Sequence, residues 1–149
     1  MNGVRSIALL AARMILGIIF IAHGWQKLHV YHLSGVEGML KGIGAPAPSV
    51  SAYILTWAEL GGGILLVLGL LLPLVSIVLV VDMIGAIYYT HWEQGFWVAA
   101  QAADMPAKIG WEWPLALIAG LLAVGFANAG HFAVDTYAFR RRGGRAVEA

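Results

Sequence analysis

The feature that most constrains this chain is a series of long apolar segments interrupted by very few charges. Of its 149 residues, 60% are hydrophobic and 11% are charged, and the mean hydropathy is +0.81. A helix needs about 20 apolar residues to cross about 30 Å of hydrocarbon. We therefore expect a small integral membrane protein in contact with the lipid bilayer, with a single domain over residues 1–149 and no nucleic-acid partner.

The apolar segments predict an all-α four-helix bundle. We place its membrane-spanning helices at residues 7–27, 50–72, 74–91 and 112–132. The first segment contains Arg13 and continues to Lys27, so we interpret it as a retained helix and not as a cleaved signal peptide. Proline ends a helix at the preceding residue and is favourable at the start of the next, so Leu72-Pro73 predicts a tight turn between two spans.

An alternative with three spans would make residues 60–81 a single helix. It would leave two apolar stretches, residues 50–58 and 83–89, in water. The charges also favour an even number of spans, because Arg5 precedes the first span and the basic tail at residues 138–149 follows the last. Under the positive-inside rule, both termini are then predicted to be cytoplasmic.

Three charged residues lie inside these apolar segments: Arg13, Glu59 and Asp82. A charge in hydrocarbon is costly unless it is paired, so such residues are functional candidates. We predict them as the catalytic group, with Arg13 close enough to meet Asp82. Two acids and one base leave a charge unmatched, which predicts either a protonated carboxyl or a second cation. A structural ion pair that fixes the register of the bundle is the alternative.

The predicted substrate-binding residues lie near the outer ends of the spans. His23 and Lys27 are four residues apart on one helix, so they share a face and could supply the second cation. Trp57 and His91 complete the predicted set. For these residues the alternatives are side chains that extend to the interface and an aromatic belt at the membrane surface.

The absence of cysteine restricts the chemistry of the chain. It excludes disulfides, thiolate nucleophiles and iron–sulfur ligation by this chain. The histidines have no spacing typical of a metal or haem site, and no flavin fingerprint is present. We therefore predict no haem, flavin or metal, and leave the identity of cofactor-binding residues open.

Several motifs resemble the DoxX family of small four-helix bacterial membrane proteins. They are Arg13-x3-Gly17-x5-His23-Gly24-x2-Lys27, Gly42-x-Gly44-x-Pro46, Glu59-x-Gly61-Gly62-x2-Leu65-x3-Gly69, Glu112-x-Pro114-Leu115 and Ala129-Gly130-x4-Asp135. The resemblance extends over roughly residues 8–136. It implies a multi-pass protein of the bacterial cytoplasmic (inner) membrane, linked to oxidoreductase complexes and oxidative-stress defence.

On this resemblance we expect a quinone-interacting subunit of a membrane oxidoreductase system. Lys27 and His23 would donate hydrogen bonds to the quinone, and Glu59 would relay protons. The redox centre would belong to a partner protein, so whether this chain is itself an enzyme stays open.

Two other functions stay open: a non-enzymatic accessory or scaffold subunit, and a small proton-coupled transporter. Glycines permit close helix contacts in membranes, which makes a homodimer another expectation. The glycines in question are Gly61, Gly62, Gly63, Gly69, Gly120 and Gly125.

Overall fold

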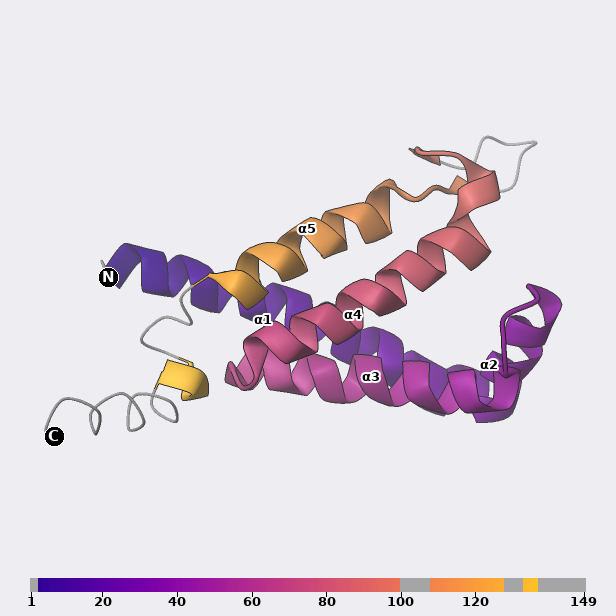
Figure 1. The fold of residues 1–149 in the computed structure, drawn as a ribbon, viewed down its shortest axis with the longest axis horizontal. Helices are drawn as coiled ribbons and strands as arrows, with labels where there is room; N and C mark the ends of the chain where they lie inside the picture. The colour runs from indigo at the N-terminus through magenta and orange to yellow at the C-terminus, as the bar shows by residue number, and fades with distance from the viewer. Residues whose placement is uncertain (1–2, 100–107, 128–132, 137–149) are drawn as a thin grey trace, which may run out of the picture.

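The computed structural model describes residues 3–99, 108–127 and 133–136, and most of these residues are helical (Figure 1). The main helices are α1 (Gly3–Gln26), α2 (His32–Gly42), α3 (Pro48–Leu68), α4 (Leu72–Ala86) and α5 (Glu112–Phe126). Two strands of two residues each, β1 (Val98–Ala99) and β2 (Lys108–Ile109), pair antiparallel. The predicted all-α bundle is confirmed, with this short strand pair added at one end.

Helices α1 and α3 form the first closely packed pair, and glycine makes their contact. A Cβ atom on Gly17 would lie 2.7 Å from the carbonyl oxygen of Gly63, and one on Gly24 would lie 2.6 Å from the amide nitrogen of Leu60. Only glycine allows the two backbones to approach this closely. Gly63 therefore marks a helix contact, as predicted, whereas a Cβ on Gly61 would have no neighbouring atom within 4 Å.

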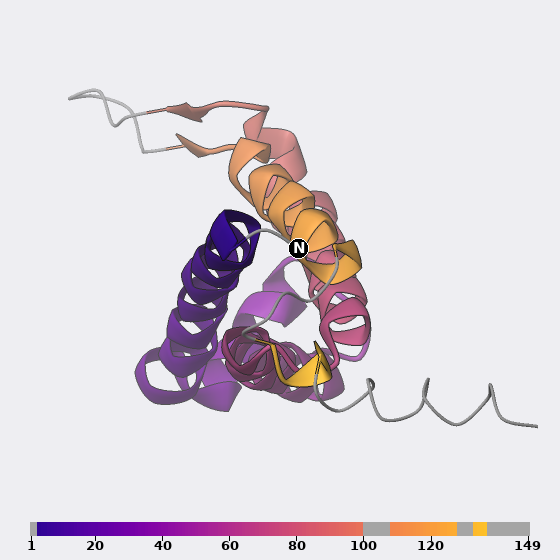
Figure 2. The same ribbon diagram turned by 90° about the vertical axis from the view of Figure 1, so that its left-hand side faces the viewer.

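Helices α4 and α5 form the second closely packed pair, where Gly125 lies against the side chain of Ser76. Viewed along the bundle, α1 lies on one side, α4 and α5 on the other, and α3 between them (Figure 2). The shared core contains residues from α1, α3, α4 and α5. It includes Leu16, Phe20, Leu66, Leu72, Leu79 and Leu121.

The turn between α3 and α4 begins earlier than the sequence predicts. Helix α3 ends at Leu68, and Gly69 caps it in the left-handed conformation with φ of 71°, which glycine adopts without a Cβ penalty. Leu71 is also left-handed, with φ of 53°, and α4 then begins at Leu72 with Pro73 in its first turn. Gly69, which we expected on a helix face, therefore ends the helix, although the proline begins the next one as predicted.

The beginning of α1 and the end of α5 lie at the same end of the bundle as the α3–α4 turn (Figure 1). Residues 133–136 dock there as well, because the Asp135 amide donates a hydrogen bond to the carbonyl oxygen of Gly69 at 3.1 Å. We call this end, formed by the α3–α4 turn and residues 133–136, the clasp end. The opposite end, where α1 continues into residues 27–31 and α4 into residues 87–91, is the cavity end. A cytoplasmic location for the clasp end stays a prediction, and the basic tail at residues 138–149 lies outside the described residues.

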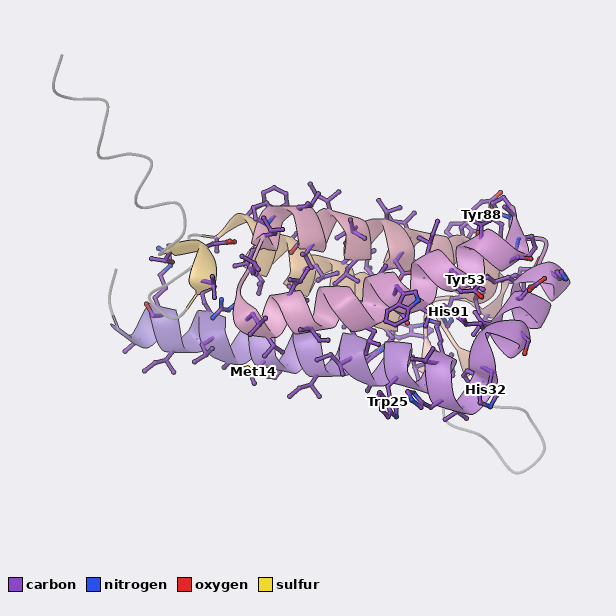
Figure 3. All side chains as sticks on the ribbon, turned by 90° about the horizontal axis from the view of Figure 1, so that it is seen from below. Met14, Trp25, His32, Tyr53, Tyr88 and His91 are labelled. Atoms are coloured by element: carbon purple, nitrogen blue, oxygen red, sulfur yellow. The ribbon has the colours of Figure 1, made fainter. Side chains whose placement is uncertain are left out.

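Apolar side chains point outward along the length of the bundle (Figure 3). Three helical stretches, residues 3–42, 48–68 and 72–94, are long and apolar enough to cross a membrane. Helix α5 is apolar but has 15 residues, or about 22 Å, and residues 128–132 of the predicted fourth span lie outside the described part. The protein is thus a membrane protein whose helices contact lipid.

The region at residues 28–49, which we expected to be a loop, contains regular structure. A π-helical turn, η1 (Lys27–Tyr31), extends α1 and leads into α2. Val36 and Leu40, four residues apart on α2, pack against Ala52 of α3, as the apolar face of an amphipathic helix does. A second π-helical turn, η2 (Ile87–His91), extends α4 toward the 3-10 turn η3 (Trp92–Gln94), so both π turns lie at the cavity end.

Candidate functional site between α2, α3 and α4

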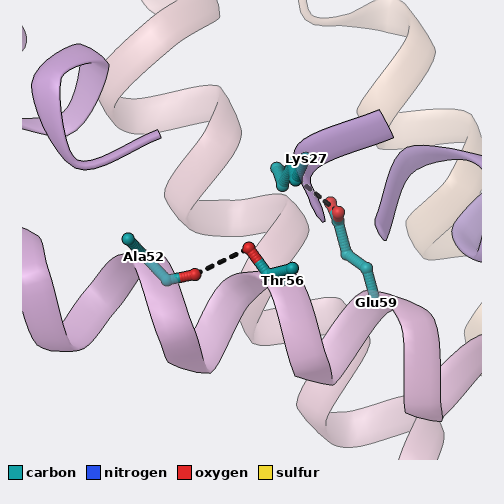
Figure 4. A network of polar contacts seen from close by, with 4 residues as sticks. All are labelled: Lys27, Ala52, Thr56 and Glu59. Atoms are coloured by element: carbon teal, nitrogen blue, oxygen red, sulfur yellow. Dashed lines mark hydrogen bonds and ion pairs between the residues drawn. The ribbon is translucent and has the colours of Figure 1, made fainter. Parts of the chain in front are cut away.

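The candidate site is built around an ion pair between Lys27 and Glu59 (Figure 4). Lys27 begins the π turn η1, and Glu59 lies in the middle of α3. The side chain of Lys27 is 17% exposed and that of Glu59 is 4% exposed, so the pair is largely removed from water. Because Gly24 packs against Leu60, the end of α1 is held directly beside the turn of α3 that carries the carboxylate.

Asp82 of α4 is the third charged member of the site. Its carboxyl group lies close enough to Glu59 and Lys27 to interact electrostatically with both, and it lines the same cavity as they do. Two carboxyl groups beside one ammonium group leave one negative charge unmatched, which is unfavourable in an apolar environment. We call Lys27, Glu59 and Asp82 the triad; it joins the α1–α3 pair to α4.

The triad lies on the wall of a cavity of about 450 Å³, which we call the triad cavity. Its other lining residues come mainly from the α2 region, α3 and α4 and are mostly apolar. They include Met39, Leu40, Ile43, Ile54, Leu55, Ile77, Val78, Val81, Met83 and Ala86, with Ser51, Tyr89 and Thr90 adding polar groups. A volume of this size and a few convergent polar groups in an apolar wall are typical of small-molecule sites.

Part of the lining of the triad cavity, on α3 and α4, is exposed on the outside of the bundle. Three of its lining residues, Ile54, Ile77 and Val81, are 61%, 49% and 63% exposed. Large apolar side chains that are this exposed on a membrane helix face the hydrocarbon. This exposed lining is the part of the cavity nearest to a ligand dissolved in the bilayer.

Both π-helical turns border the triad cavity. Lys27 begins η1, and η2 contributes Tyr89 and Thr90 to the lining. Single π turns are rare and often occur at functional sites, because the additional residue reorients the side chains that follow. The shape of the cavity thus depends on local helix geometry that apolar periodicity does not reveal.

Among the predicted substrate-binding residues, the structure brings only Lys27 to the cavity. His23 and Trp57 are exposed on the outer surfaces of α1 and α3, and neither lines the cavity. His91 lies at the same end, but its Nδ1 atom donates a hydrogen bond to the carbonyl oxygen of Ile109 at 2.7 Å. His91 therefore fixes strand β2, and in the described residues no group of three or more metal-ligating side chains occurs.

Arg13, the predicted partner of Asp82, lies at the clasp end instead. Its side chain is 1% exposed and lies against the α3–α4 turn, because a Cβ atom on Gly69 would overlap its guanidinium group. The Asp135 carboxylate interacts with it electrostatically. The structure thus separates Arg13 from the two acids with which we had grouped it.

Asp135 is a structural residue that our sequence reasoning did not single out. Its two carboxylate oxygens accept hydrogen bonds from the backbone amides of Leu71, at 2.9 Å, and Leu72, at 3.0 Å. Helix α4 has no capping side chain at its own N-terminus, so Asp135 supplies the cap from 63 residues away. Only the resemblance motif that ends at Asp135 marked this position.

A second hollow of about 420 Å³ lies beside this cap, at the clasp end. It is lined by Leu71, Leu72, Pro73, Leu74, Gly125, Ala127 and Asp135. Asp135 is its one ionisable lining residue in the described part of the chain, and both of its oxygens are already bound to α4. This hollow therefore presents no unmatched charge to a ligand.

Comparison with known proteins places the chain beside proteins of one family. A sequence model of the DoxX family matches residues 8–92, which include the whole triad. A protein of Bacillus subtilis named "Putative oxidoreductase CatD" is 38% identical over 88 residues, which are 58% of this chain and 62% of CatD. This chain thus matches less than two thirds of the length of that relative.

A second relative is matched over more of its length. The "Uncharacterized membrane protein Rv3486" of Mycobacterium tuberculosis is 28% identical over 138 residues, which are 86% of this chain and 79% of the relative. No solved structure matches the chain.

Proposed function

This chain belongs to the DoxX family of membrane proteins, and on that premise we propose that it is a quinone-binding subunit of a bacterial oxidoreductase system. The observation that carries the proposal is a largely apolar cavity with a buried ammonium group and two carboxyl groups on its wall. The name of CatD supports an oxidoreductase role. Both relatives are bacterial, so we place the protein in the cytoplasmic membrane and link it to oxidative-stress defence, as the family resemblance implies.

A quinone fits the chemistry of the triad cavity. Its headgroup carbonyls accept hydrogen bonds, and the Lys27 ammonium is a donor on the cavity wall. Its apolar tail can pass between α3 and α4, where Ile54 and Val81 are open to lipid. His23, which we expected to be a second donor, has no place in this arrangement because it is exposed on the outside of α1.

The triad can also supply the protons that reduction needs. A quinone takes two electrons and two protons to become a quinol. In this proposal the electrons come from the flavin or dithiol of a partner protein, since this chain has no cysteine. A proton held by the Glu59 and Asp82 carboxyl groups is transferred to a quinone oxygen, and solvent reprotonates the pair for the second transfer.

Quinone binding to the purified protein in lipid nanodiscs tests this proposal. The wild-type protein should bind a short-tailed ubiquinone analogue, and Lys27→Met should weaken binding about tenfold or more, because it removes a charge-assisted hydrogen bond. Glu37→Gln is the matched control, since Glu37 pairs with Lys41 and Ser49 outside the cavity. Equal binding by the wild type and Lys27→Met, with both folded by circular dichroism, contradicts the proposal.

Turnover provides a second test. In membranes with quinone-dependent activity, Glu59→Gln should abolish that activity while the protein stays inserted, because glutamine cannot carry the proton. Activity equal to that of the wild type would exclude the proton relay.

One observation favours a second function, that of a non-enzymatic accessory subunit. The Lys27–Glu59 pair joins the same two helices that Gly17, Gly24 and Gly63 already lock together, as a pair that fixes helix register would. Under this alternative, Glu59→Gln weakens the bundle or its assembly with a partner, and the purified protein binds no quinone. Quinone binding that is lost in Lys27→Met excludes this alternative.

A further inference from the structure

We propose that the triad cavity also binds a lipophilic monovalent cation, which replaces the proton held by the carboxyl pair. The ligand class is an apolar body with a single positive charge, such as a phosphonium ion or a protonated long-chain amine. This exchange uses the same cavity as the proposed quinone but requires no electron transfer. It would make the protein a proton-coupled carrier or sensor of such cations.

The charges on the cavity wall do not balance. The ionisable groups that face Asp82 are Lys27 from η1, Glu59 from α3 and Tyr89 from η2, in the part of the chain that the structure describes. No arginine or histidine is among the lining residues, and Arg13 lies at the clasp end. Two carboxyl groups therefore share one ammonium, and an unpaired carboxylate in an apolar cavity is strongly unfavourable.

In the proposed exchange, a proton on one of the two carboxyl groups fills this deficit when no ligand is bound, because Lys27 alone cannot balance both acids. A ligand cation at the same place would satisfy the same charge. In the exchange, the carboxyl O–H bond breaks, the proton leaves to solvent, and the cation pairs with the carboxylate. Each cation bound releases one proton, so charge is conserved.

The shape and the lining of the cavity select an apolar cation. Small hydrated cations would lose their water shell against walls formed by residues such as Leu55, Val78 and Met83. An apolar body gains from the same walls. The ring of Tyr89, which also lines the cavity, can contact the cation through its face. The exposed lining at Val81 is where the ligand would enter from the bilayer.

Titration calorimetry with tetraphenylphosphonium on the wild-type protein in nanodiscs tests the inference. Affinity should rise as pH rises, approaching about tenfold per pH unit where the free pair is protonated, because protons compete with the ligand. Repeating the titration in buffers of different ionisation enthalpy should show one proton released per ligand. An affinity that does not change with pH, or the absence of proton release, overturns the inference.

Variants locate the exchange. Asp82→Asn should lose the pH dependence and bind tetraphenylphosphonium at least about tenfold more weakly, since Lys27 and Glu59 then balance each other. Glu37→Gln, a carboxylate change outside the cavity, should bind as the wild type does. Asp82→Asn with wild-type affinity and pH dependence would contradict the inference. If that variant does not fold, the proton count on the wild type decides alone.

Parallel titrations with a neutral quinone analogue separate this inference from the proposed function. Cation exchange without quinone binding counts against the proposed function only. Quinone binding without cation exchange counts against this inference only.

Discussion

The clasp end and the cavity end of the bundle both contain buried charges, but the charges are matched at the clasp end and unmatched at the cavity end. At the clasp end, Arg13 faces Asp135, whose two oxygens also cap α4, so the charges and the polar backbone groups satisfy each other. At the cavity end, Lys27 is shared by Glu59 and Asp82, which leaves one negative charge unmatched. Hollows of about 420 and 450 Å³ lie beside them, so volume does not distinguish the two ends.

The difference shows which buried charges indicate function. A charge in a membrane helix is costly wherever it lies, but at the clasp end its partners meet the cost and hold the chain in place. At the cavity end, an imbalance of charge coincides with open space and with a lining that is exposed to lipid. We infer that this coincidence, and not burial alone, identifies a site.

The largest expected effect comes from removing the one base of the triad. Lys27→Met leaves two carboxyl groups buried without their cation, and it should lower the free energy of unfolding by about 3–5 kcal/mol. Thermal unfolding in detergent measures the change. The double variant Lys27→Met with Glu59→Gln should recover a large part of the lost stability. If the double variant is as unstable as the single one, unmatched charge is not what distinguishes the cavity end from the clasp end.

The next effect concerns the contact that brings α1 to α3 at the cavity end. In Gly24→Ala, the new methyl group would lie 2.6 Å from the Leu60 amide nitrogen, so the helices must separate beside the Lys27–Glu59 pair. Overpacking of this kind costs about 1–3 kcal/mol. Thermal unfolding should show a lowered midpoint together with weakened ligand binding.

Gly61→Ala is the matched control, because its Cβ position has no neighbour within 4 Å. The control should unfold and bind as the wild type does. A loss in Gly61→Ala equal to that in Gly24→Ala would show that helix packing at residue 24 is not the cause.

A smaller effect is expected at the clasp end. Asp135→Ala removes the cap of α4 and should lower the free energy of unfolding by about 0.5–2 kcal/mol, while ligand binding in the triad cavity stays unchanged. Asp135→Asn, which keeps one acceptor, should lose less. A change in binding that exceeds the change in stability would show that the two ends are coupled.

The smallest effect is expected from a residue that the sequence placed in the site. His23→Gln changes an exposed side chain outside the triad cavity, so stability should stay within about 0.5 kcal/mol of the wild type. Quinone and cation binding should also be unchanged. A loss of binding as large as that of Lys27→Met would show that His23 is part of the ligand site.

Patterns local in sequence predicted much of this molecule. Apolar runs predicted the helices, Pro73 predicted a turn between the second and third spans, and buried charge singled out Glu59 and Asp82. Gly63 was predicted as a contact because glycine in a membrane helix leaves few other interpretations. These features depend on neighbours along one helix.

Features that depend on residues far apart in the chain could not be predicted in the same way. The depth of Arg13 along its helix suggested Asp82 as its partner, but the partner that the structure shows is Asp135, in a short segment after the last helix. The pairing of Lys27 with Glu59 follows from the close approach at Gly24, which no single-helix pattern contains. The π turns that shape the cavity leave no mark in apolar periodicity.

The remote cap on α4 also sets an order of assembly. Residues enter the membrane as they are synthesised, and Asp135 follows Leu72 by 63 positions, so α4 inserts while the amides at its start still lack their acceptors. Those amides depend on water or lipid headgroups until the last helix is in place and the segment at residues 133–136 returns to the turn. The Asp135 carboxylate can therefore accept these hydrogen bonds only after the last helix has inserted, so the cap on α4 forms at the end of assembly.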